Sequence, residues 1–178
     1  MAIQLDNDPI TLNKAHRLLL ANQYLIMAML DPDHAKDHER SREAVTSGYA
    51  SAIEDLFGWI FDGLSASECS LVINSMSMYD AVQRSYKADE KQAEADGVTK
   101  GRVSYPGFDG NNETEYMGYA RYVRDYEERF TYLDTNDDCN SHMPMIDRYR
   151  TMLEVWKNQF EESYELTTDQ LKKLLEAR

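Results

Sequence analysis

The sequence has few of the residues on which most enzyme motifs depend. It contains two cysteines, Cys69 and Cys139, which are far apart and show no CxxC spacing. Neither a disulfide framework nor a thiolate zinc site is therefore expected. Its eight glycines are scattered, and they form no GxSxG, no GxxxxGK[ST] and no glycine-rich strand-to-helix turn. The sequence thus offers no familiar motif for acyl or phosphoryl transfer.

Basic residues are in the minority. The chain has 32 aspartates and glutamates against 19 lysines and arginines, which gives a formal net charge of −13. Binding to a phosphate backbone requires clustered lysine and arginine, so we expect no nucleic-acid partner. The acidic residues are concentrated between 109 and 138. This concentration is typical of a solvated face, and it would also suit a protein partner with a basic surface.

Long apolar runs are also missing. The longest, LLLANQYLIMAML at 18–30, is interrupted by Asn22 and Gln23 and is shorter than the ~20 residues that a bilayer-spanning helix needs. The first ten residues, MAIQLDNDPI, contain no basic region followed by an apolar run, so no secretory signal is expected. Together with the unpaired cysteines, these features predict a cytoplasmic protein without a membrane partner.

The composition that remains favours helices. Valine and isoleucine are sparse, and the long segments are rich in Leu, Met, Ala, Glu, Lys and Arg, which are good helix formers. A chain of 178 residues can bury one sizeable core. We therefore predict an all-α fold, a single-domain bundle of about six or seven helices with short loops over residues 1–178. Residues 1–10 are expected to be loosely ordered, and 90–104, which lack an apolar face, to form a mobile loop.

Local signals place the helix ends. Three residue pairs have the spacing of a capping box: Ser65 with Glu68, Asn112 with Glu115, and Thr167 with Gln170. Thr11 is expected to cap the first helix, which should end before Pro32. Gly48 should end the second helix, and Pro144 should occupy the first position of a later one. The dipeptide Pro106-Gly107 predicts a turn.

An aromatic stripe runs along the helix expected from about residue 113. Tyr116, Tyr119, Tyr122, Tyr126 and Phe130 recur at steps of three and four, which is one face of an α-helix. We favour packing in the core, while a pocket or interface formed by the tyrosines together with Arg121 remains open. Gly118, inside this helix, predicts the close approach of a neighbouring helix.

The second half of the first helix, within 18–30, is apolar nearly all round. Such a helix must be enclosed either by other helices of the same chain or by a second subunit. We therefore expect a homo-oligomer, with burial inside one chain as the alternative.

Candidate metal ligands are weak. His34 and His38 are four residues apart among acidic neighbours, a spacing that would place two imidazoles on one helical face, although two solvent-facing histidines would look the same. A calcium-like pattern of oxygen ligands occupies alternate positions from 134 to 142. It lacks the required glycine, because Cys139 stands there, and the bidentate glutamate, because Met145 stands there. We expect no cofactor and no metal site, and the closeness of Cys139 to His142 in sequence does not define a nucleophile pair.

Three blocks of the sequence resemble one family. They are HRLLLANQYLIMAMLDP at 16–32, YPGFDGNNETEYMGYARYV at 105–123 and MPMIDRYRTMLEVW at 143–156, and in this order they are similar to the YfbU family of uncharacterised bacterial proteins. The resemblance spans nearly the whole chain and implies a mainly helical, bacterial, cytoplasmic protein. It carries over no catalytic residue.

Two functional hypotheses follow. The first is a non-enzymatic, self-associating interaction or regulatory module, because the first helix is apolar and no catalytic motif is present. The second is a small-molecule or metal-dependent enzyme with a pocket near Tyr119, Arg121 and Tyr122. A weaker third hypothesis is a regulator that binds a basic protein through its acidic face.

Overall fold

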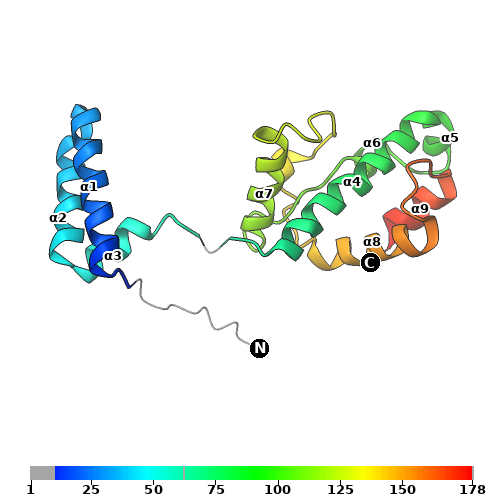
Figure 1. Cartoon of the computed structure of the whole chain (residues 1–178). Coiled ribbons are helices and arrows are strands. Elements are labelled where there is room, and N and C mark those ends of the chain that lie inside the picture. Colours follow the sequence, from blue (N-terminus) through cyan, green and yellow to red (C-terminus); the bar gives the residue numbers. More distant parts are fainter. Residues whose placement is uncertain (1–10, 62, 178) are drawn as a thin grey trace. The chain divides into compact units, whose positions relative to one another are not determined.

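The computed structural model describes residues 11–61 and 63–177, so the expectation for residues 1–10 lies outside the described residues. Within those ranges the protein has nine α-helices, two short 3-10 helices and no strand. The predicted all-α class is confirmed. The helices are α1 (Lys14–Leu30), η1 (Pro32–His34), α2 (Ala35–Ser47), α3 (Ala50–Phe57), α4 (Ala66–Ala88), α5 (Glu90–Ala95), α6 (Lys100–Val103), α7 (Thr114–Asp125), η2 (Asp137–Cys139), α8 (Ile146–Phe160) and α9 (Thr168–Glu176) (Figure 1).

The contacts divide the chain into two compact units, Met1–Asp62 and Gly63–Arg178. We refer to them as the N-terminal unit and the C-terminal unit and describe each by itself. The prediction of one domain over the whole chain stays a prediction.

The N-terminal unit is a helical hairpin. Helices α1 and α2 lie side by side, and α3 follows α2 (Figure 1). Asn13 caps α1 by accepting a hydrogen bond from the His16 backbone at 2.9 Å, so the expected cap at Thr11 is wrong by two residues. The predicted end before Pro32 is confirmed. Gly48 ends α2 in the left-handed conformation at φ 77°, as predicted.

The C-terminal unit is built around α4, the longest helix, which contacts α6, α7, α8 and α9 (Figure 1). The capping box of Ser65 and Glu68 opens α4, and that of Thr167 and Gln170 opens α9. Both were predicted. Helix α4 is buried along much of its length, because the neighbouring helices cover several of its faces.

The predicted loop at 90–104 is corrected. The segment contains α5 and α6, and it buries Ala93, Val98 and Val103 in the core. These two short helices raise the number above the expected six or seven. The three small apolar residues are five positions apart, which does not match the three- and four-residue steps of a helical stripe, so the sequence predicted a loop here.

Four aromatic rings form the centre of the core. Tyr79 meets Tyr105 at a centroid distance of 5.4 Å and Tyr149 at 6.0 Å, and Phe108 meets Tyr149 at 5.2 Å. The Tyr149 hydroxyl donates a hydrogen bond to the Gly107 carbonyl at 2.8 Å, and the Tyr105 hydroxyl is paired with Ser75 at 3.0 Å. Each of these two buried phenols therefore has the polar partner that burial requires.

The dipeptide Pro106-Gly107 joins two distant segments, and the turn predicted there is wrong, because the chain turns at 110–112 instead. Gly107 has φ +80°, and a Cβ placed on it would lie 1.9 Å from the Cys139 carbonyl oxygen. Isolated parallel bridges pair Tyr105 with Thr135 and Phe108 with Asn140 on either side of this approach. The loop after α7 is thereby held against the segment that precedes α7.

Candidate functional site

The aromatic stripe of α7 divides between core and surface. The residues that face the core are Met117, Ala120 and Val123, and Tyr116 and Tyr119 pack beside them while remaining partly exposed. Tyr122 is 48% exposed and Tyr126 is 81% exposed. Core packing was therefore the wrong expectation for these last two tyrosines.

The small and aliphatic side chains of α7 explain why Tyr122 and Tyr126 are not buried. Helix α7 contacts α4, and its buried residues are Met117, Ala120 and Val123, which are three positions apart. Because these side chains occupy the buried side of the helix, the tyrosines lie beside it and are more exposed. The rings then stack on one another, with centroids 6.1 Å apart for Tyr119 and Tyr122 and 5.7 Å apart for Tyr122 and Tyr126. Whether this ladder forms a pocket or an interface stays a prediction.

Two features predicted for α7 are wrong. A Cβ added to Gly118 would meet nothing within 4 Å, so no helix approaches closely there. The expected capping box of Asn112 and Glu115 does not form, because Glu113 is the N-cap residue and no side chain caps the helix. The helix nevertheless begins at Thr114, one residue from the predicted start.

Glu113 instead binds the start of α8. Its buried carboxylate accepts hydrogen bonds from the backbone N–H groups of Met145 at 2.8 Å, Ile146 at 2.9 Å and Asp109 at 3.0 Å. Helix α8 begins at Ile146, two residues after the predicted Pro144. A negative charge at a helix N-terminus is favourable. Sequence reasoning missed this role, since no local spacing reports a cap supplied from 32 residues away.

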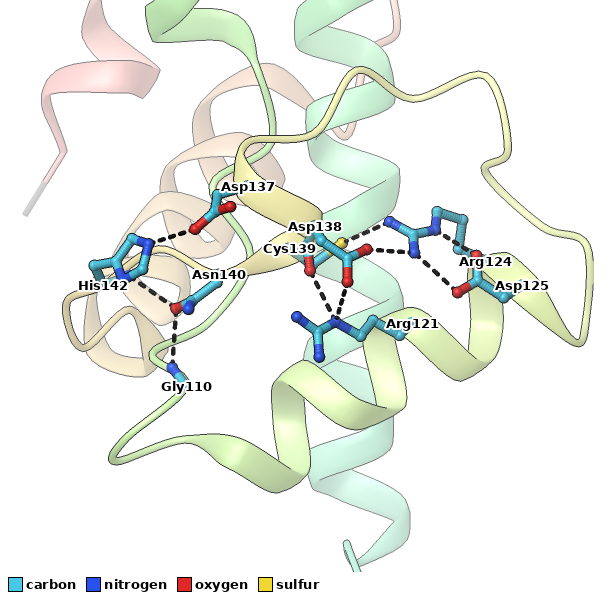
Figure 2. A network of polar contacts seen from close by, with 9 residues as sticks. All are labelled: Gly110, Arg121, Arg124, Asp125, Asp137, Asp138, Cys139, Asn140 and His142. Carbon is cyan, nitrogen blue, oxygen red and sulfur yellow. Dashed lines mark hydrogen bonds and ion pairs between the residues drawn. The ribbon is translucent and has the colours of Figure 1, made fainter.

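Arg121 and Arg124 of α7 point toward the loop that carries η2 (Figure 2). The Nε of Arg121 donates to the Asp138 carbonyl at 2.9 Å and lies 3.0 Å from the Asp138 carboxylate. The Nη2 of Arg124 donates to the same carboxylate at 2.7 Å and to Asp125 at 2.9 Å. One aspartate is thus clamped by two arginines of one helix.

The arginines also determine the local electrostatics. The hydrogen bond from Arg124 lowers the pKa of Asp125, and the same pairing raises the pKa of Arg124. Burial raises the pKa of the Cys139 thiol, which receives only a weak hydrogen bond from Arg124 at 3.6 Å. A thiol that stays protonated is a poor nucleophile and a poor metal ligand.

The backbone of the loop is strained, and side-chain oxygens of the loop accept hydrogen bonds from other residues of the chain. Asp137, Asp138, Cys139 and His142 all have positive φ, which is uncommon for residues other than glycine. His142 contacts the Asp137 carboxylate at 2.5 Å. The side-chain oxygen of Asn140 accepts from the backbone N–H groups of Gly110 and His142, each at 3.1 Å (Figure 2). The oxygens of the calcium-like pattern at Asp138 and Asn140 therefore bind protein donors.

The two histidines proposed as metal ligands converge on one carboxylate. The Oδ2 of Asp31 lies 3.0 Å from the Nδ1 of His34 and 3.3 Å from the Nε2 of His38. The His34 hydrogen bond lowers the pKa of Asp31. Across residues 11–61 and 63–177, no group of three or more histidines, cysteines, aspartates and glutamates is placed to hold a metal ion.

The outward side of α1 is an exposed apolar surface of the N-terminal unit. Helix α1 contains no buried residue. We call its outward residues the α1 face: Leu18, Leu19, Leu25, Ile26, Met29 and Leu30. They recur at steps of three, four and seven, so they lie on one side of the helix, and four of them are 63–79% exposed.

The protein is thus an all-α protein. Ion pairs from α7 hold its polar loop, and its N-terminal hairpin exposes an apolar helix face. None of the helices in the described ranges is long and apolar enough to cross a membrane. The YfbU domain matches residues 10–177, and the chain belongs to the YfbU family.

Two relatives cover nearly the whole chain. The UPF0304 protein MJECS11 of Methanocaldococcus jannaschii is 34% identical over 171 residues, which are 93% of this chain and 99% of that protein. A UPF0304 protein of Actinobacillus succinogenes is 35% identical over 162 residues, covering 90% of this chain and 96% of its own length. The expected family is confirmed, and the names of these relatives assign no activity.

Proposed function

We propose that this chain is a non-enzymatic, self-associating interaction or regulatory module that works in the cytoplasm, and that the α1 face binds a second copy of itself. The observation that carries the proposal is the exposure of six large apolar side chains on one side of a single helix. Large apolar side chains gathered on one exposed side of a helix mark an interaction surface on a folded protein.

The exposure of the α1 face supports a second copy as the occupant. Its six side chains are 42–79% exposed, so two copies that meet there would remove apolar surface from water on both sides. Two copies related by a two-fold axis would bury the same patch on both sides. The α1 face therefore suits a two-fold dimer in which one helix of each chain forms the centre of the interface.

The charge distribution permits a copy of the same chain to bind at the α1 face. The formal net charge is −13, so most surfaces of two copies repel each other. Residues 18–30 contain no charged side chain. Two α1 faces can therefore meet without burying a charge, which is costly at an interface core.

The test is a charge placed on the α1 face of the full-length chain. Leu19 is 68% exposed, so Leu19→Glu removes little packing within the hairpin. We expect the unaltered chain to be a dimer by sedimentation velocity at micromolar concentration and Leu19→Glu to be a monomer. Tyr126→Glu, at an 81% exposed position of the C-terminal unit, is the matched control and should stay dimeric.

A mixing experiment identifies the occupant. Leu19→Glu and Leu19→Lys chains should each be monomeric alone and should form a mixed dimer when combined, because opposite charges then face each other. A monomeric unaltered chain, or a dimer that persists in Leu19→Glu, would contradict the proposal. The first outcome would indicate that the face is covered within one chain or by another protein.

The enzyme alternative has less support from the geometry. Arg121, the basic residue of the predicted pocket, has its Nε bound to the carbonyl and carboxylate of Asp138. Its neighbours Tyr119 and Tyr122 stack on each other. Arg121 is used to hold the chain's own loop, which favours a structural role for this residue.

A further inference from the structure

Three stacked tyrosines form a partly exposed aromatic surface on α7, which we call the tyrosine ladder: Tyr119, Tyr122 and Tyr126. Their rings are nearly parallel, with interplanar angles of 15° between the first two and 20° between the last two. Exposure is largest at the end of the helix, where Tyr126 is 81% exposed. Stacking holds the rings in a fixed arrangement, and rigid tyrosines are enriched at protein interfaces.

Gly118 leaves the backbone of α7 open beside the ladder. It lies three residues after Glu115 and four before Tyr122, so the three residues lie on one side of the helix. A glycine inside a helix is destabilising relative to alanine. A Cβ added to Gly118 would meet nothing within 4 Å, so packing inside the C-terminal unit does not require glycine here. The position instead allows the backbone of another chain to approach closely.

The charge around the ladder is negative. Residues 109–138 contain nine aspartates and glutamates against three arginines. Two of these arginines, Arg121 and Arg124, both bind the Asp138 carboxylate (Figure 2), so their charges are already paired. Glu115, on the same side of α7 as the ladder, is exposed and forms no ion pair with any residue that the structure describes. The surface is therefore complementary to a basic partner.

This charge decides between the partners that stacked rings could bind. Nucleic-acid bases also stack on aromatic side chains, but their phosphates would be repelled by the carboxylates of this region. A second copy of the chain carries the same net charge of −13 and offers no excess of basic groups. An arginine side chain fits both features, since its guanidinium stacks on a tyrosine ring and pairs with a carboxylate.

We propose that the tyrosine ladder binds an arginine-rich segment of a basic partner protein. Guanidinium groups of the segment would lie on the rings of Tyr122 and Tyr126, and a further arginine would pair with Glu115. The backbone of the segment would pass over Gly118. The ladder contains no residue of the α1 face, so this binding does not depend on self-association.

The test follows the backbone amides of α7 in 1H–15N spectra of the full-length chain. The probe is a short peptide of alternating arginine and glycine, compared with a peptide that has glutamate in place of arginine and with a thymidine oligonucleotide. We expect the arginine peptide alone to shift the amides of Gly118 and Tyr122 with saturation, and its affinity to fall as salt rises. Shifts that do not saturate, or that the glutamate peptide or the oligonucleotide produces equally, would overturn the proposal.

Substitutions at Tyr126 test whether the aromatic ring makes the contact. Tyr126→Leu keeps an apolar side chain but removes the ring, whereas Tyr126→Phe keeps the ring. We expect the leucine variant to bind the arginine peptide about threefold more weakly and the phenylalanine variant to bind it nearly as well as the unaltered chain. Tyr49→Leu, at a 57% exposed position of the N-terminal unit, is the control and should bind normally. Equal affinity in the two Tyr126 variants would refute a contact with the ring.

A steric variant tests the approach at Gly118 without changing a ring or a charge. Because the position is open, Gly118→Leu should fold, and its side chain should block the path of the peptide beside Tyr122. We expect the affinity for the arginine peptide to fall about tenfold or more. Gly101→Leu is the matched control, since Gly101 is equally open and lies on α6. Equal binding in both leucine variants would show that the peptide does not dock on this face of α7.

Discussion

At the scale of single residues, Gly107 shows how one backbone position joins two parts of the chain. Two separate causes require glycine there. The backbone is left-handed, and the Cys139 carbonyl approaches where any Cβ would stand. Its own carbonyl also accepts a hydrogen bond from the hydroxyl of buried Tyr149. One residue therefore links the central aromatic rings to the loop that Arg121 and Arg124 clamp.

We predict that Gly107→Ala destabilises the C-terminal unit by about 3 kcal/mol or more, since backbone strain of about 1 kcal/mol is joined by a steric clash. Gly97→Ala is the control. Gly97 has φ +85°, but an added Cβ there meets nothing within 4 Å, so that variant should show the strain alone. Urea unfolding of both variants gives the comparison. Equal losses of stability would show that the approach of Cys139 is unimportant.

At the scale of elements, the helix ends show which features could be predicted from sequence. The capping boxes at Ser65 and Thr167 were predicted because both partners lie within one turn. The cap of α8 could not be, since its carboxylate belongs to Glu113. Local chemistry is readable from spacing, whereas a cap supplied across the fold needs the tertiary structure.

The candidate sites divide in the same way. The stripe of α7 was visible from its period, but which tyrosines are buried depends on how Met117, Ala120 and Val123 meet the neighbouring helix. The apolar character of α1 was readable directly from 18–30.

For the elements we predict that Glu113→Gln lowers the stability of the C-terminal unit by about 2 kcal/mol. The substituted amide loses the negative charge at the start of α8 and turns a donor toward backbone N–H groups that are themselves donors. Glu115→Gln, on the exposed side of the same helix, should be nearly neutral. Hydrogen exchange at Met145 and Ile146 should increase only in Glu113→Gln. Unchanged protection of these two amides would show that the carboxylate does not hold them.

At the scale of the whole molecule, the two units use their apolar residues differently. The C-terminal unit encloses Tyr79, Tyr105 and Tyr149 almost completely, while the N-terminal unit leaves the α1 face open. The first arrangement stabilises a chain by itself, and the second favours association. Stability of the C-terminal unit should therefore depend on the buried phenols and hardly on protein concentration, whereas the N-terminal unit should become more stable as concentration rises.

Burial of Tyr79 makes the stability of the C-terminal unit depend on pH. Burial raises the pKa of Tyr79 from 10.0 to about 12, so the folded chain holds a proton that the unfolded chain releases. The resulting stability is present in full below pH 10 and is lost as the pH rises toward 12.

We therefore predict that alkali lowers the unfolding free energy of the unaltered chain more than that of Tyr79→Phe. The phenylalanine variant has no proton to lose at this position, so the difference between the two chains should change by about 1 kcal/mol between pH 8 and pH 11. Urea unfolding, followed by the circular dichroism of the helices at both pH values, measures it. Parallel losses in the two chains would mean that Tyr79 ionises as easily in the folded protein as in the unfolded one.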